Sequence, residues 1–361
     1  MKSNSNAAIL KTLVKRGAGM DIVSGGELYR ALRAGCAPSR IVYASVGKRP
    51  DEIKEAIARG ILLFNAESER ELGRIDAIAR AMRRKAAVAL RLNPDVDSGT
   101  HKYITTGKSE NKFGIDFDSA RRIFRDADKY PGLDISGVHV HIGSQITKPE
   151  PFVKAVKKTL KFIDANGLGR RVKYFNMGGG MGIVYSKEHP QSADSFARRI
   201  KPLLRNRKFK LIIEPGRFIV GNAGILLTRV VYVKRTRSGK RFAIVDAGMN
   251  DLMRPSLYGS YHEIVPVIRR SGTAPKAVYD IVGPICESSD FLGLGRRLPV
   301  IEEGDLLAVM GAGAYGFSMS STYNSRPRAS EVMVVGKKPY VVRRRESRND
   351  IVRGEKVPPG V

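Results

Sequence analysis

The stretch VKYFNMGGGMG (residues 172–182) decides the fold, because a segment that suits a β-strand passes directly into three successive glycines. Glycines let backbone N–H groups close around an anion, normally a phosphate. A dinucleotide fingerprint would need its third glycine at Ile183, and no Gly-Lys-Ser/Thr follows to make a nucleotide-phosphate loop. The stretch therefore predicts a strand that ends either at an anion site or at a tight turn without a ligand.

The same pattern of strand and turn recurs along the first two-thirds of the chain. Strand candidates alternate with amphipathic helical segments such as DEIKEAIARG (51–60) and FVKAVKKTLKFIDANG (152–167). This alternation predicts parallel strands joined by helical crossovers. We expect strands at 21–24, 41–45, 62–66, 87–93, 136–143, 172–178 and 210–216.

Seven parallel strands can form an open doubly wound sheet, whereas a closed barrel of this class needs eight. The residues with suggestive chemistry fall at or just beyond the C-terminal ends of different strands: Arg91, His141, Gly178 and Glu214. A barrel gathers those ends around one mouth. We therefore predict an α/β fold, with a (β/α)8 TIM-type barrel over residues 1–222 that lacks its first strand. That strand would precede Lys2.

The pattern changes after about residue 222. Segments such as GILLTRVVYVKRT (224–236) and EVMVVGKKPYVVRRR (331–345) are rich in strand-forming residues and show little helical periodicity. We predict a second, mainly antiparallel β domain over residues 223–361.

The composition limits the class of protein. The chain has 64 Lys and Arg against 35 Asp and Glu, a net charge of +29, and the basic residues are spread along its length. No zinc-finger spacing accompanies them, so we expect an enzyme with anionic ligands rather than a nucleic-acid partner. Two cysteines cannot form a disulfide framework, and no apolar run reaches membrane-spanning length. We expect a cytoplasmic protein with no membrane partner.

Two motifs after predicted strands could carry chemistry. In EPGR (214–217), Glu214 can point into the barrel mouth while Pro215 and Gly216 force a sharp exit; the alternative is a strand end with a surface ion pair. In HVHIGSQ (139–145), His139 and His141 face the same way on a strand. They could begin a zinc site, although no convincing third ligand is present and we expect no metal. A ring stacked on a planar cofactor and an ordinary core histidine also fit.

Three motifs stand out in the β-rich part. Cys286 beside Glu287 reads either as a proton donor next to a carboxylate that grips an ammonium group, or as a buried thiol. Tyr315 lies in a small-residue turn, where its hydroxyl could reach a phosphate. Arg254 and Tyr258 form a plausible carboxylate clamp. Together these pieces indicate one planar, phosphorylated cofactor and a lysine able to bind it, which is the profile of pyridoxal 5'-phosphate.

An ordered set of motifs extends over nearly the whole chain, and with it the sequence resembles the diaminopimelate decarboxylase family. This family belongs to the alanine-racemase-like, fold type III class of pyridoxal-phosphate enzymes. The motifs are KSNSNAAILKTL, GAGMDIVSGGEL, NKFGI, GVHVHIGSQI, MGGGMGI, EPGRFIVGNAG, DAGMNDLMRPSLY, GPICESSD, AGAYGFSMSSTYN and RPRASEVMV.

The resemblance implies roles for individual residues. Lys2 matches the lysine that forms a Schiff base with the cofactor, His141 the ring that stacks on the pyridine, and Glu214 the carboxylate paired with the pyridinium nitrogen. Cys286 matches the proton donor. The other cofactor positions are matched by Ser144, Gly178, Gly179, Gly180, Pro215, Gly216, Arg217 and Tyr315. The substrate positions are matched by Arg217, Arg254, Tyr258, Glu287 and Tyr315.

The implied activity is decarboxylation of meso-2,6-diaminopimelate to L-lysine and CO2, the last step of lysine biosynthesis. The alternatives are a decarboxylase of ornithine, arginine or carboxynorspermidine, and an inactive truncated homologue. Relatives supply the equivalents of Cys286 and Glu287 from a partner subunit, which implies a homodimer with shared active sites.

The start of the chain departs from the family pattern. The family has Tyr-Ala-apolar-Lys-Ala-Asn around its lysine, whereas here Met1 takes the apolar position and Ser3 replaces the alanine. We therefore expect the first barrel strand and an N-terminal strand of the β domain to be missing, with an internal methionine serving as the start.

Overall fold

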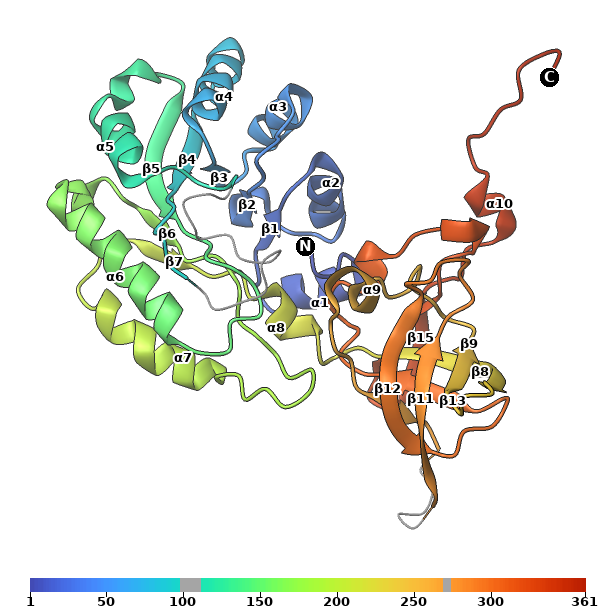
Figure 1. Ribbon diagram of the computed structural model, residues 1–361. Coiled ribbons are helices and arrows are strands. Elements are labelled where there is room, and N and C mark those ends of the chain that lie inside the picture. The colour runs from blue at the N-terminus through green and yellow to red at the C-terminus, as the bar shows by residue number, and fades with distance from the viewer. Residues whose placement is uncertain (98–111, 269–273) are drawn as a thin grey trace. The chain divides into compact units, whose positions relative to one another are not determined.

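The computed structural model describes residues 1–97, 112–268 and 274–361 (Figure 1). The chain divides into two compact units. The first contains residues 1–183 and 188–218, and the second contains residues 184–187 and 219–361.

Seven parallel strands form the sheet of the first unit, and they follow one another in chain order from β1 to β7. A doubly wound sheet would reverse its order part-way along, so the sheet confirms the barrel-type prediction. The strands are β1 (Met20–Ile22), β2 (Ile41–Tyr43), β3 (Leu63–Ala66), β4 (Ala86–Arg91), β5 (Leu133–His139), β6 (Tyr174–Asn176) and β7 (Lys210–Ile212).

The helices that connect these strands lie around the outside of the sheet in Figure 1, while one further helix precedes β1 and another follows β7. They are α1 (Ala7–Lys15), α2 (Gly25–Arg33), α3 (Pro50–Arg59), α4 (Glu69–Ala81), α5 (Phe117–Arg125), α6 (Glu150–Ala165), α7 (Ala193–Ile200) and α8 (Gly216–Val220). Short 3₁₀ turns complete the connections at Pro38–Arg40, Ala127–Lys129, Leu168–Arg170 and Lys201–Leu204.

Side-chain caps explain how the chain turns from strand into helix within a few residues. Ser24 Oγ accepts a hydrogen bond from the Glu27 N–H, and Ser68 Oγ accepts one from the Glu71 N–H, both at 3.2 Å. Asp116 caps α5 in the same way, 2.8 Å from the Ser119 nitrogen. Each contact satisfies an N–H that the first helical turn leaves without a partner, and a cap of this kind contributes about 1 kcal/mol.

The core of the first unit lies between the sheet and its helices. Every residue of β3 is buried, and so are all but one of those of β4, as expected for parallel strands covered on both faces. The outermost strands, β1 and β7, each pair on one side only within the described residues. On β7 and just after it, Leu211 is 44% exposed and Ile213 is 49% exposed.

The second unit is built mainly on a six-stranded sheet in the order β10-β13-β8-β9-β11-β12. All its neighbouring pairs are antiparallel except β9 and β11, which confirms the predicted β-rich, mainly antiparallel fold. The strands are β8 (Leu226–Arg235), β9 (Arg241–Val245), β10 (Ile264–Pro266), β11 (Lys276–Val282), β12 (Phe291–Pro299) and β13 (Leu306–Val309). The remaining elements are α9 (Arg254–Tyr258), the hairpin of β14 (Glu331–Val335) and β15 (Lys338–Arg343), α10 (Arg348–Ile351), and 3₁₀ turns at Phe317–Met319 and Tyr323–Ser325.

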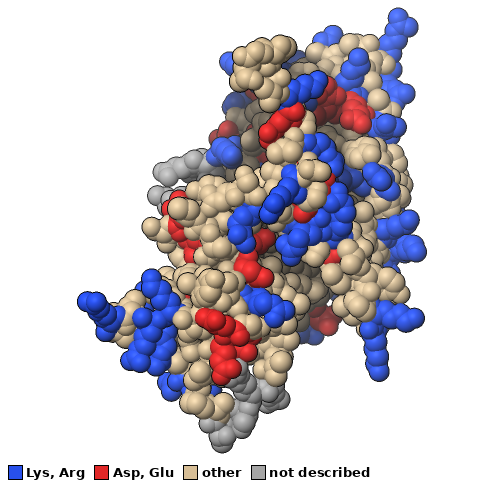
Figure 2. All heavy atoms as spheres, turned by 90° about the vertical axis from the view of Figure 1, so that its right-hand side faces the viewer, with Lys and Arg blue, Asp and Glu red and all other residues tan. Residues whose placement is uncertain are grey.

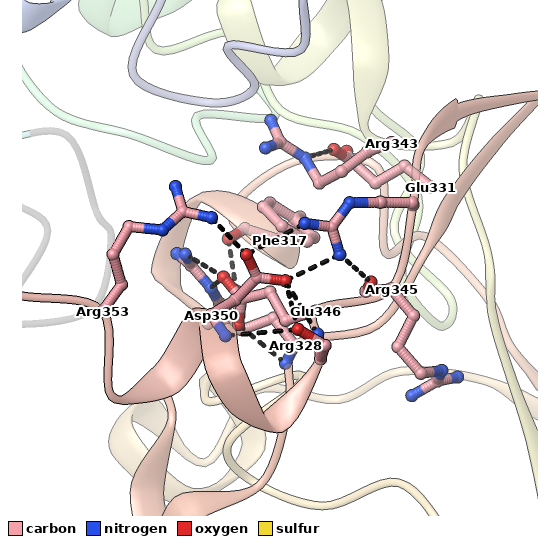
Figure 3. A network of polar contacts seen from close by, with 11 residues as sticks. Phe317, Arg328, Glu331, Arg343, Arg345, Glu346, Asp350 and Arg353 are labelled. Carbon is pink, nitrogen blue, oxygen red and sulfur yellow. Dashed lines mark hydrogen bonds and ion pairs between the residues drawn. The ribbon is translucent and has the colours of Figure 1, made fainter.

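The C-terminal basic cluster RRRESR (343–348) lies among acidic partners, as Figure 3 shows. Arg343 Nε lies 2.5 Å from Glu331, and Arg344 lies 2.6 Å from Asp350, which also pairs with Arg353. Within the cluster, Glu346 pairs with Arg328, whose guanidinium holds the pKa of that carboxyl below its usual value. The densest run of basic residues is thus partly neutralised by its own surroundings.

Figure 2 shows Lys and Arg spread over the face in view, with Asp and Glu among them. Among the described residues, no helix combines the length and apolar character that crossing a membrane requires.

Candidate active site

Glu214 is the best-defined member of the candidate site. It follows β7, and its backbone N–H donates to the Gly178 carbonyl at 2.8 Å, so hydrogen bonding between the two segments continues two residues past the ends of β6 and β7. Asn176 Nδ2 donates to Glu214 Oε1 at 2.7 Å. Burial raises the pKa of Glu214 to about 8, and the nearby Asp21 carboxylate adds to the rise. Without a cationic partner, the site therefore favours the neutral carboxylic acid at this position.

The two histidines beside Glu214 take different positions. β5 ends at His139, so the predicted strand 136–143 ends four residues early. His139 Nε2 lies 3.6 Å from Glu214 Oε1. Burial, and then Arg91, hold the pKa of His139 well below its usual range, so this approach is not an ion pair. His141 is held neutral in the same way, and its Nδ1 accepts a hydrogen bond from the Gly179 N–H at 3.1 Å.

The three glycines after β6 are needed where loops approach closely. A Cβ on Gly178 would collide with the carbonyl of Val140, and one on Gly179 with the carbonyl of Glu214. Gly178 and Gly180 also have positive φ values, +68° and +109°. The Gly178 N–H donates to Asn176 Oδ1 at 2.9 Å. The N–H groups of Gly178 and Gly179 thus bind the side chains of Asn176 and His141. The glycine run alone predicted an anion site or an empty turn, and not these contacts.

The chain around Lys2 lies against the turn after β7. Ser3 is buried, and a Cβ on Gly216 would fall 2.8 Å from Ser3 Oγ. Lys2 itself is exposed, and its charge opposes the rise in the pKa values of both Asp21 and Glu214. The structure therefore brings Lys2, Glu214 and His141, three of the predicted site residues, into one electrostatic neighbourhood.

Arg217 and Ser144 also meet in this unit. Arg217 is buried in α8, and its Nη2 donates to Ser144 Oγ at 3.0 Å. The residues are 73 positions apart in the sequence. Both were predicted to serve the cofactor, and the contact fixes one end of the Arg217 guanidinium.

Asp21, in β1, is a site residue that the sequence analysis missed. Burial raises its pKa, while Lys2, the terminal amino group, Arg91 and Lys48 oppose that rise. Asn176 was missed as well. Asp21 is the middle residue of β1 and Asn176 is the last residue of β6, positions that many purely structural residues share, so the sequence carried no specific signal for either.

The remaining predicted residues belong to the second unit. Cys286 and Glu287 are both exposed, in the turn between β11 and β12. Tyr258 and Tyr315 are partly buried, and Tyr315 has a positive φ of 59°. Arg254 is 5% exposed and begins α9.

Asp290 organises the turn that carries Cys286 and Glu287. Its Oδ1 accepts from the Met249 N–H at 2.6 Å, and its Oδ2 accepts from the Ile285 N–H at 2.7 Å. Burial raises the pKa of this carboxyl. The sequence analysis missed Asp290 because the motif Ser-Ser-Asp occurs both in exposed surface loops and in turns whose Asp holds the backbone in place.

The first unit fits a cofactor with a cationic ring nitrogen. Glu214 is a buried carboxyl whose raised pKa a positive partner would lower. Beside it, neither ring nitrogen of His139 has a hydrogen-bond partner within the described residues. In those residues, no group of three or more His, Cys, Asp or Glu is placed to hold a metal ion.

Comparisons with known proteins show the family of the chain. Residues 1–221 match the family model of the pyridoxal-dependent decarboxylases, pyridoxal binding domain. The chain is 49% identical to the diaminopimelate decarboxylase of Vibrio cholerae, covering 99% of this chain and 86% of that enzyme. It is equally identical to the Aquifex aeolicus enzyme, covering 98% of this chain and 84% of that enzyme.

Solved structures show the same relationship. The diaminopimelate decarboxylase of Helicobacter pylori, complexed with L-lysine, superposes with a TM-score of 0.93 at 42% identity. That match covers 98% of this chain and 88% of the other. An arginine decarboxylase from Paramecium bursaria Chlorella virus, at 22% identity and a TM-score of 0.79, shares the fold. From its site, its fold and these matches, the chain belongs to the diaminopimelate decarboxylase family of pyridoxal-dependent decarboxylases.

Proposed function

We propose that this chain is a pyridoxal-phosphate-dependent carboxy-lyase that converts meso-2,6-diaminopimelate to L-lysine and CO2, the last step of lysine biosynthesis. The observation that carries the proposal is the 49% identity to a diaminopimelate decarboxylase over 99% of the chain. The buried carboxyl of Glu214, beside two neutral histidines, gives that identity a chemical basis.

The residues of the first unit would hold the cofactor. Lys2 would bind it covalently, His141 would stack on its ring, and Glu214 would pair with its ring nitrogen. Its phosphate would be held by the turns of Gly178 to Gly180 and of Pro215 and Gly216, with Ser144 and Arg217 as further contacts. Tyr315, in the second unit, is proposed as one more phosphate contact. When bound, pyridoxal phosphate supplies an electron sink for the charge that the departing carboxylate leaves on Cα.

The protein's own groups control the protons of the reaction. The raised pKa of Glu214 keeps a proton at its carboxyl when no cation is near, and that proton is available to the ring nitrogen when a ring is bound. Cys286 Sγ is proposed to protonate Cα after CO2 leaves. The Cys286 N–H donates to Asn324 Oδ1 at 2.8 Å, which fixes the backbone that carries this thiol.

The far end of diaminopimelate carries both a carboxylate and an ammonium group, and two kinds of residue are proposed to bind them. Arg217 and Arg254, with Tyr258 and Tyr315, suit the carboxylate, while Glu287 suits the ammonium. We also propose a homodimer in which Cys286 and Glu287 serve the partner's site. A cytoplasmic location stays a prediction.

The test is a Lys2→Ala variant of the full chain, with the exposed Lys11→Ala as its matched control. Wild type and Lys11→Ala should show a visible absorption band after addition of pyridoxal phosphate and should release CO2 from diaminopimelate. Lys2→Ala should lose both properties, while equilibrium dialysis still detects non-covalent binding through the phosphate contacts. A band that persists in Lys2→Ala would show that another lysine binds the cofactor.

A further inference from the structure

Arg254 lies in a set of contacts that fix its orientation. Its Nη1 donates to His262 Nε2 at 2.7 Å, and its Nη2 donates to Ser260 Oγ at 3.2 Å. Its Cζ lies 4.5 Å from the centroid of the Tyr185 ring, a cation–π distance. All four residues belong to the second unit. We call Tyr185, Ser260 and His262 the Arg254 cradle.

The hydrogen bonds of His262 determine where its proton lies. A guanidinium has no acceptor atom, so His262 Nε2 must accept the hydrogen bond from Arg254. The other nitrogen, Nδ1, lies 2.8 Å from the Met310 carbonyl oxygen, which can only accept. Nδ1 therefore carries the proton, and the ring is neutral.

Through these hydrogen bonds the Arg254 guanidinium is linked to the backbone of the six-stranded sheet. Met310 directly follows β13, and its N–H donates to the Glu263 carbonyl at 2.8 Å, one residue after His262. His262 has no measurable exposure, and its ring meets that of Tyr185 edge-on at 5.0 Å. The backbone of the β10–β13 pair thus sets the position of the imidazole, and the imidazole sets that of the guanidinium.

A neutral partner has a specific advantage at this position. An Asp or Glu at 262 would also hold the guanidinium, but it would cancel much of the charge that attracts a substrate carboxylate. An imidazole accepts one N–H and leaves the net positive charge in place. His262 therefore orients the guanidinium without itself adding a negative charge that would oppose the binding of an anion.

We propose that His262 is a positioning residue for Arg254. It orients the guanidinium, and the guanidinium binds the carboxylate at the non-reacting end of the substrate and so sets the affinity for it. The proposal rests on the proposed function, because Arg254 has to be a substrate contact. It assigns a role to a buried histidine that the site described above does not use.

Three substitutions separate this role from a purely structural one. His262→Phe keeps an aromatic ring and loses both nitrogens. His262→Asn keeps a donor for the Met310 carbonyl but loses the acceptor for Arg254. His262→Gln places an acceptor near the position of Nε2. The exposed His189→Gln serves as the control for loss of a histidine. Thermal unfolding identifies any variant that fails to fold.

The measurements are KM and kcat for diaminopimelate and the calorimetric Kd for L-lysine, which keeps the non-reacting carboxylate. His262→Phe and His262→Asn should raise KM and Kd by about 10- to 100-fold, the usual effect of losing a hydrogen bond to a charged group. Their kcat should change much less. His262→Gln should recover most of the affinity. In an Arg254→Ala background, His262→Phe should have no further effect.

Two results would overturn the inference while leaving the proposed function intact. One is an active wild type whose folded His262→Asn and His262→Phe variants keep wild-type KM and Kd. The other is an effect of His262→Phe that persists at full size when Arg254 is already alanine. A wild type that neither binds L-lysine nor decarboxylates diaminopimelate would overturn the proposed function, and the inference with it.

Discussion

At the scale of single residues, Glu214 has a pH-dependent role in stability as well as a proposed role in catalysis. Its pKa of about 8 in the cofactor-free site compares with an ordinary value of 4.5. Between these values the folded protein holds a proton that the unfolded chain has lost. The contribution of Glu214 to the free energy of unfolding therefore falls as the pH rises from about 4.5 to about 8.

A Glu214→Gln variant should remove this dependence, because an amide does not titrate. Urea unfolding of the cofactor-free protein from about pH 5 to about pH 8 should show a smaller fall in stability for the variant than for wild type. The exposed Glu303→Gln serves as the control and should behave like wild type. Parallel curves for wild type and Glu214→Gln would mean that Glu214 is ionised in the cofactor-free protein.

At the scale of the elements, the sequence predicted the alternation of strands and helices, because strands covered on both faces are short apolar runs whereas helices buried on one face repeat every 3.6 residues. It could not predict which side chains meet. Asn176 donates a hydrogen bond to Glu214, which is 38 positions away in the sequence. Nothing around Asn176 in the sequence indicates which residue it contacts. Family motifs identified Arg254, but the neutral histidine behind it depends on a hydrogen bond that only the folded sheet defines.

The turn after β6 offers a test of how neighbouring elements position the site. A Cβ on Gly179 would meet the carbonyl of Glu214, a backbone atom that cannot rotate away. Gly179→Ala should therefore separate the ends of β6 and β7, at a cost of about 1–3 kcal/mol in stability. The affinity for pyridoxal phosphate should fall by about tenfold or more, since about 1.4 kcal/mol corresponds to tenfold.

Gly169→Ala is the matched control, because nothing lies within 4 Å of a Cβ at that position. Fluorescence titration with pyridoxal phosphate and thermal unfolding give the two readouts. Normal cofactor affinity in a folded Gly179→Ala variant would show that the loop tolerates the extra atom and that Glu214 is not positioned by this contact.

At the scale of the whole molecule, net charge and exposed apolar surface have opposite effects on self-association. With a net charge of +29, molecules of this chain repel one another at neutral pH. Strand β7 nevertheless pairs on one side only within the described residues, and it presents Leu211 at 44% exposure. A strand edge that exposes apolar side chains can pair with a strand of another chain. Charge repulsion should therefore limit self-association that the edge would otherwise permit.

Added salt should favour self-association. The screening length falls from about 30 Å at 0.01 M salt to about 10 Å at 0.1 M, so repulsion between molecules weakens while the apolar edge is unaffected. Light scattering of the cofactor-free chain should rise with NaCl concentration, and Leu211→Lys should reduce that rise by charging the edge. Val278→Lys adds the same charge at a position of similar exposure on β11, which is paired on both sides, and should have a smaller effect. Equal protection by both lysines would assign the effect to net charge alone, and scattering that falls with salt would show that opposite charges drive the association.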